Sequence, residues 1–147
     1  MKTKNLIDVI LLMVSGVICK ALGGWDFPLS TLAIFILVDV LTGVYIALVL
    51  HKSPKTQSGK LSSGVGFHGI MKKFFIFVMV AIMYRIDLLF DIDYLRIGTI
   101  VAYLFNEGVS IIENFIIMDI YVPDIVKKGI DLLHEGGEND EDKHWKS

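Results

Sequence analysis

The longest apolar run in the chain does most to limit how it can fold. Residues 29–50 carry a single charged side chain, Asp39, and Trp25, Phe27 and Pro28 stand just before them. About 20 apolar residues in a helix cross the hydrocarbon layer of a bilayer, and aromatic residues gather at its edges. The chain has 147 residues, 54% of them hydrophobic, and a positive mean hydropathy of +0.62, which is rare for a soluble domain of this size. We therefore predict an all-α integral membrane protein.

Other apolar blocks predict further helices at about 6–22, 70–90 and 96–118, besides the one at 28–50. In the first block the apolar run between Asp8 and Lys20 rises only about 16 Å, roughly half the hydrocarbon thickness. This helix spans if its two charges reach the interfaces, and otherwise lies in the interface or packs against the other helices. Its basic start also fits a secretory signal, but another apolar block follows, so an uncleaved helix is expected. The count is three to four transmembrane helices.

The C-terminal part changes character after residue 122. Pro123 stands at a helix start, and apolar residues then recur at helical spacing opposite Lys127, Lys128 and Asp131, which predicts a short amphipathic helix at 123–134. Residues 135–147 are acidic and poor in apolar side chains, so we expect a disordered cytoplasmic tail. The chain then divides into a helical membrane domain, 1–134, and this tail.

Basic residues predict the orientation in a bacterial cytoplasmic (inner) membrane. With four spans, the lysine-rich segments fall on one side, and the positive-inside bias places both termini and the loop before residue 70 in the cytoplasm. With three spans, only the N-terminus changes side. The residues expected as anchors on the cytoplasmic side are Lys52, Lys55, Lys72, Lys73, Lys127 and Lys128.

Several functional classes are disfavoured. The net charge is −2 and no basic stripe exists, which argues against nucleic acid as a partner. The single cysteine, Cys19, lies in an apolar run, and the four histidines lack the spacing of a metal site. Residues 64–69 fit G-x-G-x-x-G, but we expect them in a flexible loop without the strand that a dinucleotide site needs. No nucleophile and base stand out, so we predict no enzyme, no cofactor and no metal.

Polar residues inside the apolar blocks are the candidates for function. Asp39 and Glu107 lie near the midpoints of their helices, where a charged residue costs about 2.5 to 3.5 kcal/mol. Arg85 is the only cation expected at a similar depth, so Arg85 and Asp87 are candidate ion-pair residues. The acids either hold helices together or face water in an assembled pore. The candidates for the pore or the subunit interface are Asp39, Asn106, Glu107, Ser110, Glu113 and Asn114.

From residue 37 to 133 the order of these features resembles the phage holin family that includes the clostridial toxin-secretion holins. The most specific stretch is Asn106 to Asn114, followed by Val122-Pro123 and the basic helix. The other matching stretches are Asp39 to Gly43, Leu61 to Gly66, Gly69 to Lys73, and Arg85 to Asp87. Met118 to Tyr121 departs from the pattern, because the family more often has a glycine there.

The resemblance implies a protein that accumulates in the cytoplasmic membrane, associates with itself and opens a non-specific hole. An endolysin, or a toxin without a signal peptide, would pass through it as cargo. The partners expected are therefore further copies of the chain, membrane lipid and this cargo. An alternative drawn from the residues is an accessory membrane subunit or a small ion or solute transporter that uses its intramembrane carboxylates.

Overall fold

The structure is a computed structural model, and it describes residues 2–54 and 63–133. These residues form helices and no strands, which confirms the all-α prediction. The elements are α1 (Lys2–Ala21), α2 (Phe27–Tyr45), a π-helical turn η1 (Ile46–Leu50) that continues α2, α3 (Ser63–Phe90) and α4 (Leu95–Ile117). Residues 124–133 are also helical. Lys55 and the acidic tail predicted at 135–147 lie outside the described residues.

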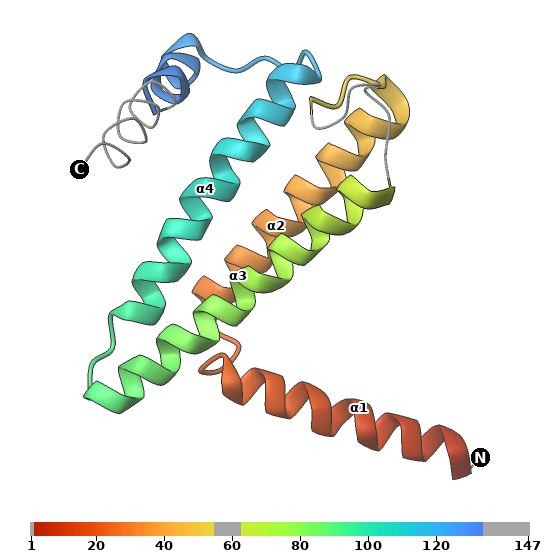
Figure 1. Ribbon diagram of the computed structural model, residues 1–147, viewed down its shortest axis with the longest axis vertical. Helices are drawn as coiled ribbons and strands as arrows, with labels where there is room; N and C mark the ends of the chain where they lie inside the picture. Colours follow the sequence, from red (N-terminus) through yellow and green to blue (C-terminus); the bar gives the residue numbers. More distant parts are fainter. Residues whose placement is uncertain (1, 55–62, 134–147) are drawn as a thin grey trace.

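Three of the helices form a bundle (Figure 1). α2 and α4 run in the same direction, α3 runs in the opposite one, and α1 projects away from one end of the bundle. α4 packs against both α2 and α3. The C-terminal ends of α2 and α4 therefore lie at the same end of the molecule, which is also where α3 begins.

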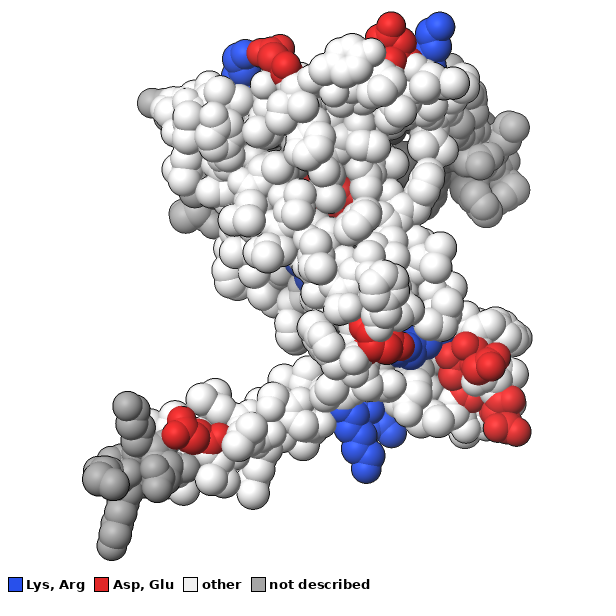
Figure 2. Space-filling model, turned by 180° about the vertical axis from the view of Figure 1, so that it is seen from behind, with Lys and Arg blue, Asp and Glu red and all other residues white. Residues whose placement is uncertain are grey.

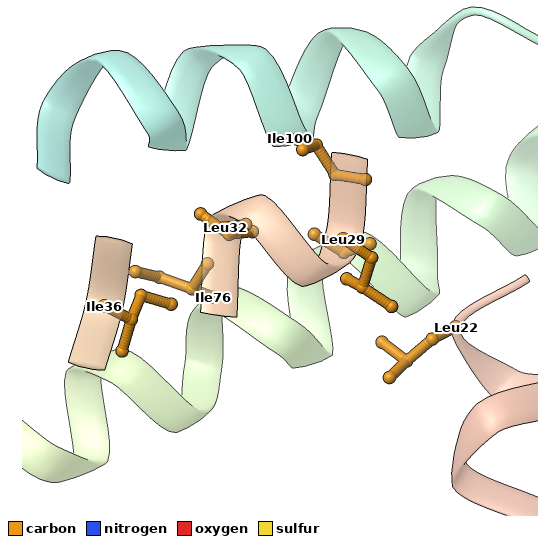
Figure 3. Close-up of a cluster of buried hydrophobic side chains, with 7 residues drawn as sticks. Leu22, Leu29, Leu32, Ile36, Ile76 and Ile100 are labelled. Atoms are coloured by element: carbon orange, nitrogen blue, oxygen red, sulfur yellow. The ribbon is translucent and has the colours of Figure 1, made fainter. Parts of the chain in front are cut away.

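The half of the bundle next to α1 has an apolar core. Leu29, Leu32 and Ile36 recur every three or four residues along α2, so they share one face of that helix. They pack against side chains from the turn after α1, from α3 and from α4 (Figure 3). The buried members outside α2 are Leu22, Ile76, Val80 and Ile100.

Polar side chains fix the helix ends beside this core. Asp26 caps α2 by accepting a hydrogen bond from the backbone N–H of Leu29 at 3.1 Å. The buried Arg96 donates to both carboxylate oxygens of Asp26, at 2.7 and 3.1 Å, and to the carbonyl of Leu22 at 2.6 Å. The guanidinium holds the pKa of Asp26 below its ordinary value. These bonds tie the α1–α2 turn to the start of α4.

Asp87 closes the turn between α3 and α4. Its two carboxylate oxygens accept hydrogen bonds from the backbone N–H groups of Leu95 at 3.0 Å and Arg96 at 2.8 Å. The first N–H groups of a helix have no partner within the helix, so this buried carboxylate satisfies two of them. Asp87 was predicted as an ion-pair residue, but it acts here as a cap, and Arg85 beside it is exposed.

Two helices meet the length and hydropathy of a membrane span among the described residues, and not three to four as predicted. They are Phe27–Leu50, with 24 residues and a mean hydropathy of 2.6, and Leu95–Ile117, with 23 residues and a mean hydropathy of 1.4. α1 has only a short apolar stretch between its charges. α3 carries Lys72 and Lys73 in one half and Arg85 and Asp87 in the other.

α3 begins earlier than the sequence predicted. The glycine-rich segment at 64–69 was expected to be a loop before a helix at 70–90, but the helix runs from Ser63. Adding residues to an existing helix is easier than starting one, so a long apolar helix can extend through three glycines despite their low propensity. The G-x-G-x-x-G segment therefore forms the first turns of a helix.

The surface of the bundle is apolar around its middle. Figure 2 shows one face, on which nearly all exposed acidic and basic side chains lie towards the two ends of the bundle and on α1. Large apolar side chains are exposed on each bundle helix, including Leu37 on α2, Phe74 on α3 and Phe105 on α4. Such a surface fits a lipid environment.

Candidate functional site

The bundle buries a group of polar side chains beyond the apolar core. We call it the polar network, and its members are Asp39 and Thr42 on α2, Lys73 on α3, and Glu107, Ser110 and Asn114 on α4.

Asp39 is the centre of the polar network and is only 4% exposed. Its Oδ1 accepts hydrogen bonds from Ser110 Oγ at 2.6 Å and from Asn114 Nδ2 at 3.1 Å. Its Oδ2 lies 2.9 Å from Lys73 Nζ. Both oxygens of this carboxylate therefore have partners, and the partners come from the two other helices of the bundle.

Lys73 joins the two deepest acids, because its ammonium group contacts both Asp39 and Glu107 Oε2. The expectation that Arg85 is the only cation at their depth is wrong. Lys73 was predicted to anchor the cytoplasmic rim, together with Lys72, from the first turn of its helix. Because α3 starts at Ser63, Lys73 is instead about 15 Å along the helix, and its side chain lies between α2 and α4.

Asn114 and Thr42 extend the polar network towards the C-terminal ends of α2 and α4. Asn114 Nδ2 donates to Thr42 Oγ1 at 2.8 Å, and Thr42 Oγ1 donates in turn to the backbone carbonyl of Val38 at 2.9 Å. The hydroxyl of Thr42 thus accepts one hydrogen bond and donates another, as a buried hydroxyl can. Thr42 was not predicted as a site residue, although its spacing of three residues from Asp39 places both on one face of α2.

Glu107 is completely buried, and only one of its carboxylate oxygens is satisfied. Oε2 contacts Lys73, whereas Oε1 has no hydrogen-bond partner among the described residues. The polar network thus sets one ammonium group against two carboxyl groups. Burying charged groups is costly unless they are paired. We therefore expect the stability of the bundle to depend on the charges of Lys73, Asp39 and Glu107.

The other predicted site residues lie outside the polar network. Asn106 is exposed on the outer side of α4, and Glu113 is half-buried and takes part in an interaction of its own. Lys52 lies 3.9 Å from Asp119, and both are well exposed. Among the other predicted anchors, Lys127 lies 3.6 Å from Asp124 on the surface, and Lys72 and Lys128 are exposed.

A model of the bacteriophage holin family matches residues 16–135, which include the end of α1, the whole of α2, α3 and α4, and the complete polar network. The chain belongs to the bacteriophage holin family. This family is not a family of enzymes. The match agrees with the resemblance seen in the sequence, and it begins earlier, within α1.

Similar proteins occur in several bacteria and in a phage. An uncharacterized 14.9 kDa protein in the nagH 3′ region of Clostridium perfringens is 35% identical over 76% of this chain and 80% of its own length. The uncharacterized protein Lmo0128 of Listeria monocytogenes is 37% identical over 84% of each chain. A probable holin of Bacillus phage phi105 is 23% identical over 78% of this chain and 80% of its own length. No solved structure matches the chain.

Proposed function

We propose that this holin-family protein assembles with copies of itself in the cytoplasmic membrane and forms a non-specific pore. The pore would release an endolysin, or a toxin that has no signal peptide. The observation that carries the proposal is the contrast between an apolar outer surface and a polar network inside one small bundle. Family membership and the phage relative support it.

The direction of the helices supports a third membrane span. α2 and α4 are the two helices with the length and hydropathy of spans, and they run in the same direction. If both cross the bilayer, the chain between them must cross it once more, and α3 is the helix between them. Lys73 can lie at this depth because two carboxyl groups accompany it. α1 lies apart from the bundle and is not needed for this count.

The same arrangement suggests how the pore opens. In a single copy the polar network faces inward, and its members satisfy one another except at Glu107 Oε1, so the copy can remain in lipid. In the assembled state the bundle opens, and Asp39, Glu107, Ser110 and Asn114 turn towards water. Water and neighbouring copies then replace the partners that each side chain gives up, and water also reaches the unpartnered Oε1 of Glu107.

The test is release of probes of different sizes. Vesicles that contain the purified protein should release both a small ion and a dye-labelled polymer of the size of a small protein, which is the large dye of this experiment. Induced expression in a bacterium should depolarise the membrane. With an endolysin that lacks a signal peptide, the same cells should lyse. Intact membrane potential at confirmed expression would contradict the proposal.

A second candidate, a small-ion transporter or accessory subunit, is favoured by one observation. Three charged groups from three helices meet within one copy, and one carboxylate oxygen among them has no partner in the described chain. A single copy could bind a small cation there. In the vesicle experiment this candidate gives saturable, ion-dependent flux and retention of the large dye.

A further inference from the structure

On the outer face of α4, three successive turns carry short, uncharged side chains. Gly98, Ala102 and Asn106 are spaced four residues apart, so they lie on neighbouring turns of one face, and all three are exposed. A Cβ atom on Gly98 would meet nothing within 4 Å. Glu107, which joins the buried polar network, lies about 100° around the helix from Asn106 and is completely buried. The described chain therefore leaves this outer face uncovered.

Asn106 is the polar group on that face, and it stands at the midpoint of the candidate span Leu95–Ile117. Its side chain forms no hydrogen bond with the residues that the structure describes. A carboxamide has two donor hydrogens and an acceptor oxygen, and lipid tails can satisfy none of them. In the membrane, Asn106 thus needs a polar partner from another molecule.

We propose that this face of α4 binds the same face of a second copy of the chain, with the two Asn106 carboxamides hydrogen-bonded to each other. A carboxamide is both donor and acceptor, so an identical group complements it. The three positions carry no charge that would repel a like copy, and Gly98 and Ala102 allow two helix backbones to approach closely. This inference rests on the proposed self-assembly and names the surface that performs it.

Cross-linking in membranes tests the contact. In a chain with Cys19→Ala, the variant Ala102→Cys should form disulfide-linked dimers under mild oxidation. Val101→Cys is the matched control, because Val101 is also exposed but lies about 100° away around the helix. Dimers from Ala102→Cys at several times the rate of Val101→Cys support the contact. Equal rates overturn it.

The second measurement tests the amide itself. Asn106→Leu should raise the dissociation constant of the purified protein in detergent by about three- to tenfold, as expected for one interhelical hydrogen bond pair. Asn106→Gln, which keeps the amide, should restore most of the association, and both variants should keep the helical content of the parent. An unchanged dissociation constant in Asn106→Leu would refute the role of the amide.

The two proposals can fail separately. Release of the large dye without preferential cross-linking at position 102 removes this interface and leaves the pore. Strong cross-linking at position 102 with vesicles that retain every probe removes the pore and leaves the interface.

Discussion

Lys73 connects all three helices of the bundle through one ammonium group. It contacts Asp39 on α2 and Glu107 on α4, and its side chain is only 20% exposed. An exposed ion pair contributes little, whereas removing one partner of a buried pair leaves an uncompensated charge. We therefore expect Lys73 to contribute far more to the stability of the bundle than its exposed neighbour Lys72.

Replacing Lys73 should destabilise the bundle strongly. Lys73→Met leaves two buried carboxyl groups without their cation, which typically costs about 3–5 kcal/mol. We expect a marked fall in the unfolding midpoint of the detergent-solubilised protein, followed by circular dichroism. Lys72→Met is the matched control, because its side chain is exposed, and it should leave the midpoint nearly unchanged. Similar midpoints for the two variants would show that the pairs contribute little.

The sequence identified part of the polar network and missed its cation. Asp39 and Glu107 stood out because charges are rare in apolar runs, and Ser110 and Asn114 were candidates because they are polar residues inside the same apolar block as Glu107. Lys73 was misjudged because the depth of a residue depends on where its helix starts, and glycines at 64–69 suggested a later start. Arg96 was missed because its partner Asp26 lies 70 residues away, and no local pattern links such a pair.

At the scale of elements, the turn between α1 and α2 depends on two glycines. Gly23 and Gly24 both have positive φ, at 82° and 97°. A Cβ atom on Gly23 would lie 2.8 Å from Tyr84 Cδ2 and 2.9 Å from Arg96 Nε, whereas one on Gly24 would meet nothing within 4 Å. Only Gly23 thus combines backbone strain with a close contact.

The two glycines should therefore respond differently to alanine. Gly24→Ala should cost about 1–2 kcal/mol, since an L-residue is disfavoured at positive φ. Gly23→Ala should cost more, because Arg96 must also shift and lengthen its hydrogen bonds to Leu22 and Asp26. Thermal unfolding of the two variants in the same detergent measures the difference. Equal losses would mean that Arg96 adapts without cost.

For the whole molecule, the bundle determines which segments share a side of the membrane. With α2, α3 and α4 as spans, Trp25, which precedes α2, lies on one side of the membrane. Lys52, which follows η1, and Tyr121, which follows α4, lie on the other. From the positive-inside bias we propose that Lys52 and Tyr121 lie on the cytoplasmic side. The sequence alone could not decide between three and four spans, because α1 is short and charged. Hydropathy by itself also does not show that α2 and α4 are parallel, which is the observation that favours α3 as a span between them.

Cysteine labelling tests this topology. In a Cys19→Ala background, a membrane-impermeant maleimide should label Trp25→Cys in intact cells, and label Lys52→Cys and Tyr121→Cys only after permeabilisation. All three positions are exposed, so access alone does not separate them. Expression must stay below the level that depolarises the membrane. Labelling of all three in intact, polarised cells would contradict the arrangement.

The cap that Asp87 provides has a consequence for how the chain enters the membrane. A helix start normally brings unsatisfied amide groups with it, and these resist transfer into lipid. In the α3–α4 turn, two of those groups are already bound by a carboxylate from the preceding helix. The carboxylate of Asp87 thus takes the place of the water that these two amide groups would otherwise bind. We expect α3 and α4 to pass into the bilayer together as one hairpin, in which the paired Lys73 and Glu107 enter together and neither crosses as a lone charge.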